Sequence, residues 1–129
     1  MIHDAFITHL QGAGLGVPVR AAFTTEPVTD YSEDFPVILV YPTADELAPS
    51  EADNFVIQQQ TTQVAAMIGC KYSELSAVVL AFRAAAQGWV AGAPWDALEL
   101  QGGAVEGLRG EFIWWRETVT AQRSVRQSL

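Results

Sequence analysis

Residues of the types that bind metals or act as nucleophiles are few in this chain, and their spacing does not group them. His3 and His9 are the only histidines, and Cys70 is the only cysteine. On the helix expected over residues 2–11, the two histidines lie about 240° apart around the axis, so they cannot share a metal ion. The sequence has no Cys-x-x-Cys, His-Glu-x-x-His or phosphate-loop motif. We therefore expect no metal site and no cofactor.

The acidic and hydroxyl side chains are also poor candidates for catalysis. The pairs Glu33–Asp34 and Asp45–Glu46 occur among other charges and turn residues, whereas a glycosidase-type pair needs a shaped, partly apolar cleft. Ser73 has no base beside it that could activate it. The glycines of residues 12–16 follow an expected helix and not a strand, which is the wrong context for a nucleotide loop. We expect no catalytic residues and a protein that is not an enzyme.

The amino-acid composition indicates that part of the surface of this chain is covered by a partner. Its 129 residues fit a single domain, residues 1–129. Half of the residues are hydrophobic and only 17% are charged, against about a quarter in ordinary domains. Because monomers rarely expose large apolar patches, we infer that a partner covers part of the surface. A compact fold with an alanine-rich helix is the alternative explanation.

The charge is unevenly distributed along the chain. The net charge is −8, and residues 1–60 hold nine of the fifteen acids with a single base, Arg20. This acidic half argues against sequence-specific DNA binding, which needs a basic footprint, but it fits a surface that repels DNA. No apolar run approaches the roughly 20 residues that span a bilayer, and no signal-peptide pattern is present, so we expect no membrane partner.

Hydrophobic periodicity and turn residues predict an α+β fold, with a mostly antiparallel sheet and two helices packed on one face. Ile2, Phe6 and Leu10 form the apolar stripe of the first helix. Ser73 is the expected N-cap of the second helix. The expected elements are a helix over 2–11, strands over 17–23, 35–42 and 55–68, acidic loops over 24–34 and 43–54, a helix over 72–89, a turn over 92–95, two strands joined by a Gln-Gly-Gly turn within 97–108, and a last strand over 111–120.

The stretch QQQTTQ inside residues 55–68 is polar on both faces, although a strand in a monomer should have one apolar face. It fits a solvated strand that projects beyond the core. It also fits two strands split by a turn, although no Gly, Pro or Asn marks one. A strand whose amides pair with a neighbouring subunit is the third interpretation. We favour a projecting strand that meets neighbours.

The last strand carries two adjacent tryptophans, Trp114 and Trp115, which must point to opposite faces. One interpretation is a central strand covered on both faces within the monomer. The other is that one face meets another subunit, because Trp and Arg are enriched at such contacts. Arg116 and Glu117 would then lie at the rim of that contact.

Three stretches together suggest a family. A helix ends in Gly88–Trp89, a Leu-containing strand with a Gly-rich turn runs from Leu98 to Gly103, and an aromatic pair at 114–115 is followed by an acidic residue and Thr118. With the opening helix, the acidic loop and the strand FPVILVYP, this order resembles the tail terminator proteins of long-tailed, siphovirus-like or myovirus-like, bacteriophages.

The resemblance implies an α/β subunit that assembles as a homo-hexameric ring. The ring caps the tail tube protein, ends its polymerisation and offers a face to the head-tail connector protein. DNA passes through the lumen without specific binding, and no cofactor is needed. Such a protein belongs to the tail or neck of the virion and is assembled in the host cytoplasm.

Within this ring, we assign contacts with subunits or the tube to residues 55–64 and 110–126, and the lumen to 24–34 or 43–54. The assigned contact residues are Trp114, Trp115, Arg116, Glu117, Arg123, Gln58, Gln60 and Thr62. The assigned lumen acids are Glu26, Asp30, Glu33, Asp34, Asp45 and Glu46.

Two other functions stay open at this point. The chain could be another phage neck or tail-completion component, to which the same physical arguments apply. It could also be a small dimeric ligand-binding α+β domain, with Trp89, Trp95 and Trp114 forming an aromatic pocket.

Overall fold

The fold is a five-stranded, mostly antiparallel sheet with two helices, which confirms the α+β prediction. The computed structural model describes residues 2–22, 35–50 and 55–128. The strand order is β1-β2-β3-β5-β4, and only β1 and β2 are parallel. The elements are α1 (Ile2–Gln11), β1 (Val19–Ala21), β2 (Val37–Leu47), β3 (Phe55–Lys71), a 3-10 turn η1 (Tyr72–Glu74), α2 (Leu75–Ala86), β4 (Glu99–Arg109) and β5 (Phe112–Ser128).

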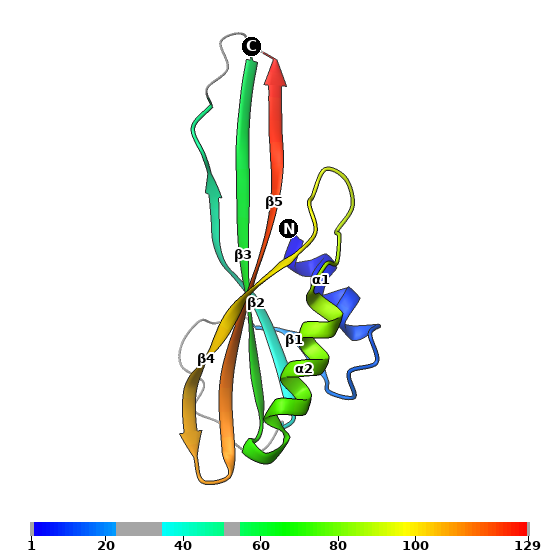
Figure 1. Ribbon diagram of the computed structural model, residues 1–129, viewed down its shortest axis with the longest axis vertical. Helices are drawn as coiled ribbons and strands as arrows, with labels where there is room; N and C mark the ends of the chain where they lie inside the picture. Colours follow the sequence, from blue (N-terminus) through cyan, green and yellow to red (C-terminus); the bar gives the residue numbers. More distant parts are fainter. Residues whose placement is uncertain (1, 23–34, 51–54, 129) are drawn as a thin grey trace.

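Both helices cover the same face of the sheet (Figure 1). The stripe Ile2, Phe6 and Leu10 of α1 is buried as the periodicity predicts. Phe6 meets Phe82 of α2 edge to face, with 6.1 Å between ring centroids. These side chains pack on the inward-facing residues of β3 and β5, such as Ile68 and Ile113, to form the main core. Burial of this apolar surface is the main force that holds the helices on the sheet.

The second helix differs from the prediction at both ends. Ser73 is not its N-cap, because residues 72–74 form the turn η1 and Glu74 occupies the cap position without a side-chain cap hydrogen bond. The helix ends at Ala86 and does not reach Trp89. Gly88 follows with a φ of 80°, a left-handed conformation that terminates helices and favours glycine.

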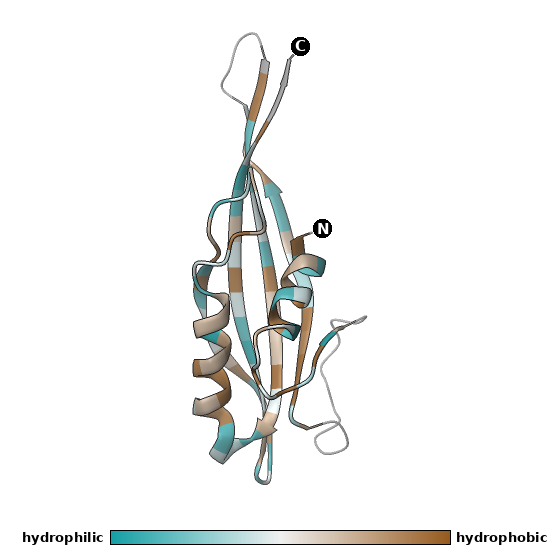
Figure 2. Ribbon diagram, turned by 90° about the vertical axis from the view of Figure 1, so that its right-hand side faces the viewer, coloured by the Kyte–Doolittle hydropathy of each residue, from teal (hydrophilic) through white to brown (hydrophobic). Residues whose placement is uncertain are grey.

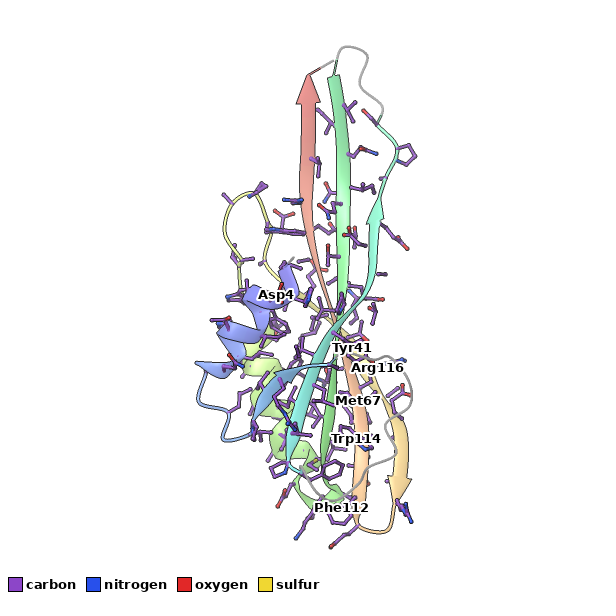
Figure 3. The ribbon with its side chains drawn as sticks, turned by 180° about the vertical axis from the view of Figure 1, so that it is seen from behind. Asp4, Tyr41, Met67, Phe112, Trp114 and Arg116 are labelled. Carbon is purple, nitrogen blue, oxygen red and sulfur yellow. The ribbon has the colours of Figure 1, made fainter. Side chains whose placement is uncertain are left out.

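The opposite face of the sheet carries a second, smaller core. Tyr41, Met67 and Trp114 lie on this face, turned away from the helices (Figure 3). Phe35 meets Trp114 edge to face at 4.8 Å between ring centroids. Gly69 leaves room for this contact, because a Cβ there would lie 2.5 Å from the Phe35 ring and 2.7 Å from Trp114. The apolar run of β2 is therefore buried on both faces, as predicted for residues 35–42.

The sheet extends well beyond the helices as an arm (Figure 1). The arm has three strands as far as Leu47 and Gln60, and beyond them β3 and β5 continue as a pair among the described strands. We define the arm as residues 43–47 of β2, 55–63 of β3 and 120–128 of β5. Strands β3 and β5 pair without a break from Lys71 and Phe112 to Phe55 and Ser128. The prediction of a projecting strand at 55–68 is thus confirmed in outline. The predicted loop over 43–54 is wrong for residues 43–47, and the last strand does not end at 120. Backbone pairing with the polar strand extends both, and this pairing requires no apolar pattern.

Strand β4 also differs from the prediction. The Gln-Gly-Gly stretch does not turn the chain, because residues 99–109 form one strand with irregular register at Leu100/Gly102 and at Val105/Gly107. The extra residues are bulges, and Gly102 supplies a φ of 106°. The turn lies later, at Gly110 with a φ of 61°, between β4 and β5. The first strand is shorter than expected, with three residues. Neither described helix has the length and apolar character needed to cross a membrane.

Candidate assembly surfaces

Strand β5 carries the adjacent tryptophans that the sequence predicts on opposite faces, and this prediction is confirmed. Trp115 lies on the helix face with Ile113 and Val119, whereas Trp114 belongs to the second core. Trp114 is 3% exposed, and Trp115 is half-buried. Both tryptophans therefore have apolar cover within one chain. The interpretation of β5 as a strand covered on both faces holds for this part of it.

Glu117 does not lie at the rim of a contact surface, and that prediction is wrong. Its side chain is fully buried and accepts hydrogen bonds from Arg83 Nε at 3.0 Å and Arg83 Nη2 at 2.8 Å. Trp115 Nε1 donates a third hydrogen bond at 2.7 Å. Hydrogen bonding to Glu117 raises the pKa of Arg83. Three donors thus satisfy a buried carboxylate that would otherwise be strongly destabilising.

Gly103 of β4 makes room for this buried group. It pairs with Glu117 in the register of β4 and β5, on the helix face. A Cβ at this position would collide with the Trp115 indole and with Glu117 Oε1.

The sequence carries a partial indication of this buried pair. Glu117 interrupts the apolar face of residues 113–119, and Arg83 is the only charged residue of α2. Nothing in the sequence pairs these two residues, which lie 34 positions apart.

Arg116 lies on the far face and stays at the surface. Its side chain is 44% exposed, and Nη1 lies 3.2 Å from Glu106 Oε1 of β4. An exposed pair of this kind contributes little to stability. Arg116 is therefore accessible to a partner, whereas its neighbour Glu117 is not.

At the root of the arm, a bulge in β2 changes which side chains face the helices. Pro42 pairs with Val64, but Ala44 pairs with Gln63, so one extra residue interrupts the alternation. The bulge places Asp45 beside Thr62 on the helix face. Without the extra residue, Asp45 would point to the opposite face.

Four of the predicted site residues meet at this point. Asp45 Oδ1 accepts hydrogen bonds from Thr62 Oγ1 at 2.7 Å and from Gln60 Nε2 at 2.8 Å. The amide oxygen of Gln60 accepts a hydrogen bond from Arg123 Nε. The bonds from Thr62 and then Gln60 lower the pKa of Asp45 below its ordinary value. We call these four residues, Asp45, Gln60, Thr62 and Arg123, the polar ladder, because they cross all three strands of the arm.

The polar ladder forms one wall of a cleft. The cleft has a volume of about 580 Å³, and its apolar wall consists of Ile2, Ala5, Ala91 and Trp95. The Arg123 guanidinium lies over the Trp95 ring, 4.7 Å from its centroid, in a cation–π contact. Thr62 is 2% exposed. Its assigned role as a direct contact residue is therefore wrong, and its hydroxyl instead holds Asp45.

The other predicted residues are more dispersed. Gln58 lies on the arm and donates from Nε2 to the Ala48 carbonyl at 3.2 Å. Glu46 is exposed on the arm and not in a loop. The acids at 26, 30, 33 and 34 lie outside the described residues. Of the assigned lumen acids, the structure describes Asp45 and Glu46, and both are exposed.

The three tryptophans proposed for an aromatic pocket do not meet. Trp89 stacks on His9 at 5.1 Å and contacts Phe6 at 5.5 Å within the main core. Trp95 lies at the cleft, whereas Trp114 is on the other face of the sheet. His9 Nε2 lies 2.7 Å from the Ala85 carbonyl oxygen, where its N–H can donate. Among residues 2–22, 35–50 and 55–128, no group of three His, Cys, Asp or Glu could hold a metal ion.

A comparison of the chain with protein families finds none that matches, and a comparison with curated proteins finds no match.

Proposed function

We propose that this chain is a structural subunit of a phage tail, which forms a hexameric ring at the end of the tail tube. The ring ends polymerisation of the tube and joins it to the head connector, and DNA passes through its lumen. The observation that supports this proposal most is the arm, an extension of the sheet that reaches past both helices (Figure 1). Its central strand reads QQQTTQ, polar on both faces.

An arm of this kind adds little to the stability of one copy. Its strands pair through the backbone, but the helices cover only the other half of the sheet (Figure 1). Ordering the residues of the arm costs conformational entropy that buried apolar surface does not offset there. Contact with other subunits would supply the missing interactions. The arm therefore favours a protein that functions as part of an assembly.

The rest of the surface supports the same proposal. On α2, Leu80 is 67% exposed, and on β4 Leu108 is 60% exposed. Figure 2 shows α2 coloured mostly towards the hydrophobic end of the scale. Arg83 is the only charged residue of that helix, and it is paired inward with Glu117. Apolar surface with so few charges is typical of a face that a partner covers.

The charge of the chain suits a channel for DNA that does not grip it. The net charge of −8 repels phosphates, and a ring repeats each exposed acid once per subunit. Asp45 and Glu46 are both exposed on the arm, but Asp45 is held by hydrogen bonds from Thr62 and Gln60. We assign Glu46 to the lumen in preference to Asp45. The proposed role is structural and not enzymatic, needs no cofactor or membrane, and belongs to the tail or neck of the virion after assembly in the host cytoplasm.

The test is a polymerisation reaction of the tail tube protein from the same phage, with and without this chain. Electron microscopy gives the distribution of tube lengths. We expect the chain to stop elongation at substoichiometric amounts and to keep capped tubes from growing when more tube protein is added. Tubes that continue to grow would overturn the proposal. Binding to the connector without any effect on tube growth would indicate another neck component.

The cleft favours a second candidate, a dimeric ligand-binding domain. Its volume of about 580 Å³ would hold a small molecule between Trp95 and the polar ladder. The tryptophan arrangement first proposed for this function is absent, because Trp114 lies on the other face. Sedimentation velocity distinguishes the candidates. A closed dimer of 14.0 kDa chains at all concentrations favours ligand binding, and a larger closed species favours the ring.

A further inference from the structure

We propose that neighbouring copies join edge to edge through their arms, with the β2 edge of one copy beside the β5 edge of the next. This inference rests on the proposed ring and names the surface that closes it. A second copy of this chain covers each edge.

Both outer strands of the arm have an edge that no described strand covers. Strand β1 pairs with β2 only over Ile38–Val40, which leaves Tyr41–Leu47 without a strand on that side. Strand β4 pairs with β5 only as far as Thr120. One further bond, from Asp96 N to Gln122 O, extends this cover slightly. Beyond it, β5 continues to Ser128 with β3 alone as its neighbour among the described strands.

Uncovered edges of this length are templates for another strand. Their free N–H and C=O groups can pair with a strand from a second chain, and proteins usually block such edges with short strands, proline or bulges. Among the described residues, the blocks on the β2 edge lie at its root, where Pro42 is followed by the bulge between Pro42 and Ala44. A closed ring of arms would pair every β2 edge with a β5 edge.

The charges on the two edges are complementary. The β2 edge carries Asp45 and Glu46, and the β5 edge carries Arg123. Among the described residues, nothing engages Glu46, Asp45 Oδ2 or the terminal nitrogens of Arg123 in a hydrogen bond or ion pair. The Arg123 guanidinium stacks on Trp95 of its own chain, but its terminal N–H groups stay available as donors, and Asp45 Oδ2 stays available as an acceptor. Opposite charges on the two edges favour contact between a β2 edge and a β5 edge, and they disfavour contact between two edges of like charge.

The two edges differ, and this difference decides the symmetry. A two-fold contact would join β2 to β2 or β5 to β5, which brings like charges together. A contact between unlike edges is heterologous, and it closes into a ring when the rotation between copies allows it. Strands β2 and β5 both run antiparallel to β3, so they run in the same direction. Copies arranged around an axis along the arms would place β5 of one copy parallel to β2 of the next.

A disulfide test uses the positions of Glu46, Gln122 and Ser124. Glu46 pairs with Thr61, and Thr61 pairs with Gln122, so these residues lie in one row on the same face. Within one copy, Cα atoms on β2 and β5 are two strand spacings apart, roughly 9.6 Å. That separation exceeds the roughly 7 Å limit for a disulfide. Any bond between cysteines at these positions must therefore join two copies.

The experiment combines Glu46→Cys with Gln122→Cys or Ser124→Cys in a Cys70→Ala chain, oxidised alone and in the presence of tail tubes. We expect a ladder of covalent oligomers on a non-reducing gel that ends at the size of the ring. Each single cysteine should give no ladder. The matched control pairs Glu46→Cys with Thr8→Cys, on the exposed surface of α1. Any of three results would overturn the edge pairing. They are equal cross-linking by the control, the absence of a ladder both alone and with tail tubes, and dimers from Ser124→Cys alone.

The same reduced variants also separate this inference from the proposed function. If the oxidised variants give no ladder but the reduced chain still caps tubes normally, the edge pairing is contradicted and the capping role stays intact. A full ladder from a chain that never stops tube growth would contradict the capping role and support the edge pairing.

Discussion

Arg83 and Glu117 form an ion pair across the boundary between α2 and the sheet, with Arg83 Nη2 at 2.8 Å from Glu117 Oε1. The Glu117 side chain is fully buried, and the Arg83 side chain is 37% exposed. The pair therefore ties the helix to the centre of the sheet, and the carboxylate depends on that one cation.

Arg83→Ala should destabilise the monomer by about 3 kcal/mol, because it leaves a buried carboxylate without its charge partner. The matched control is Arg116→Ala, which breaks the exposed pair with Glu106 and should cost under about 1 kcal/mol. Urea unfolding followed by tryptophan fluorescence measures both. Equal losses for the two variants would show that the buried pair has no special weight.

Gly103→Ala should destabilise the fold, because its Cβ would displace the Trp115 indole or the Glu117 carboxylate. We expect a loss of about 1–3 kcal/mol, as for overpacking in a core. The control is Gly12→Ala, where the nearest atoms to an added Cβ are backbone oxygens at 3.7 Å. Thermal unfolding compares the two. A neutral Gly103→Ala variant would show that the site is less closely packed than the structure indicates.

Cys70 should be unreactive in the folded protein. Burial raises the pKa of its thiol from 9.0 to about 11, so almost no thiolate exists at pH 8. Alkylation at pH 8 should therefore proceed only through unfolded molecules. The thiol has a higher pKa in the folded protein than in the unfolded chain. Its contribution to the free energy of unfolding is therefore fully present below about pH 9 and is lost as the pH rises towards 11. Rapid alkylation under native conditions would contradict this prediction.

Thr62→Val should raise the pKa of Asp45 towards its ordinary value of 3.8, because the Thr62 hydroxyl is the main cause of the lowered value. Since the folded pKa is depressed, the interaction stabilises the fold above pH 3.8 and is lost as the pH falls through the lowered pKa. NMR titration of the Asp45 carboxyl measures the shift. Thr61→Val, which changes the adjacent hydroxyl on the other face, should leave the titration unchanged.

The sequence predicts the fold well wherever apolar periodicity decides the structure. The stripe of α1, the both-face burial of β2 and the opposite faces of Trp114 and Trp115 all follow from local patterns. The arm was predicted only in part, because pairing between residues as far apart as Phe55 and Ser128 depends on backbone partners that no local pattern specifies.

The candidate site was predicted less well, for a related reason. The bulge between Pro42 and Ala44 has no mark in the sequence, yet it brings Asp45 to Thr62 and Gln60. Glu117 was expected at the rim of a contact on the interpretation that one face of the last strand meets another subunit. Its burial depends on Arg83 and Gly103, which come from other elements. Local patterns therefore give faces and elements, but not the partners that satisfy a buried charge.

The most direct test of the ring is averaged electron microscopy of tail tubes capped by this chain. We expect a closed ring of six copies at the tube end, with a central channel continuous with the lumen of the tube. Tube ends without added density, or with dimers attached to the side of the tube, would contradict it.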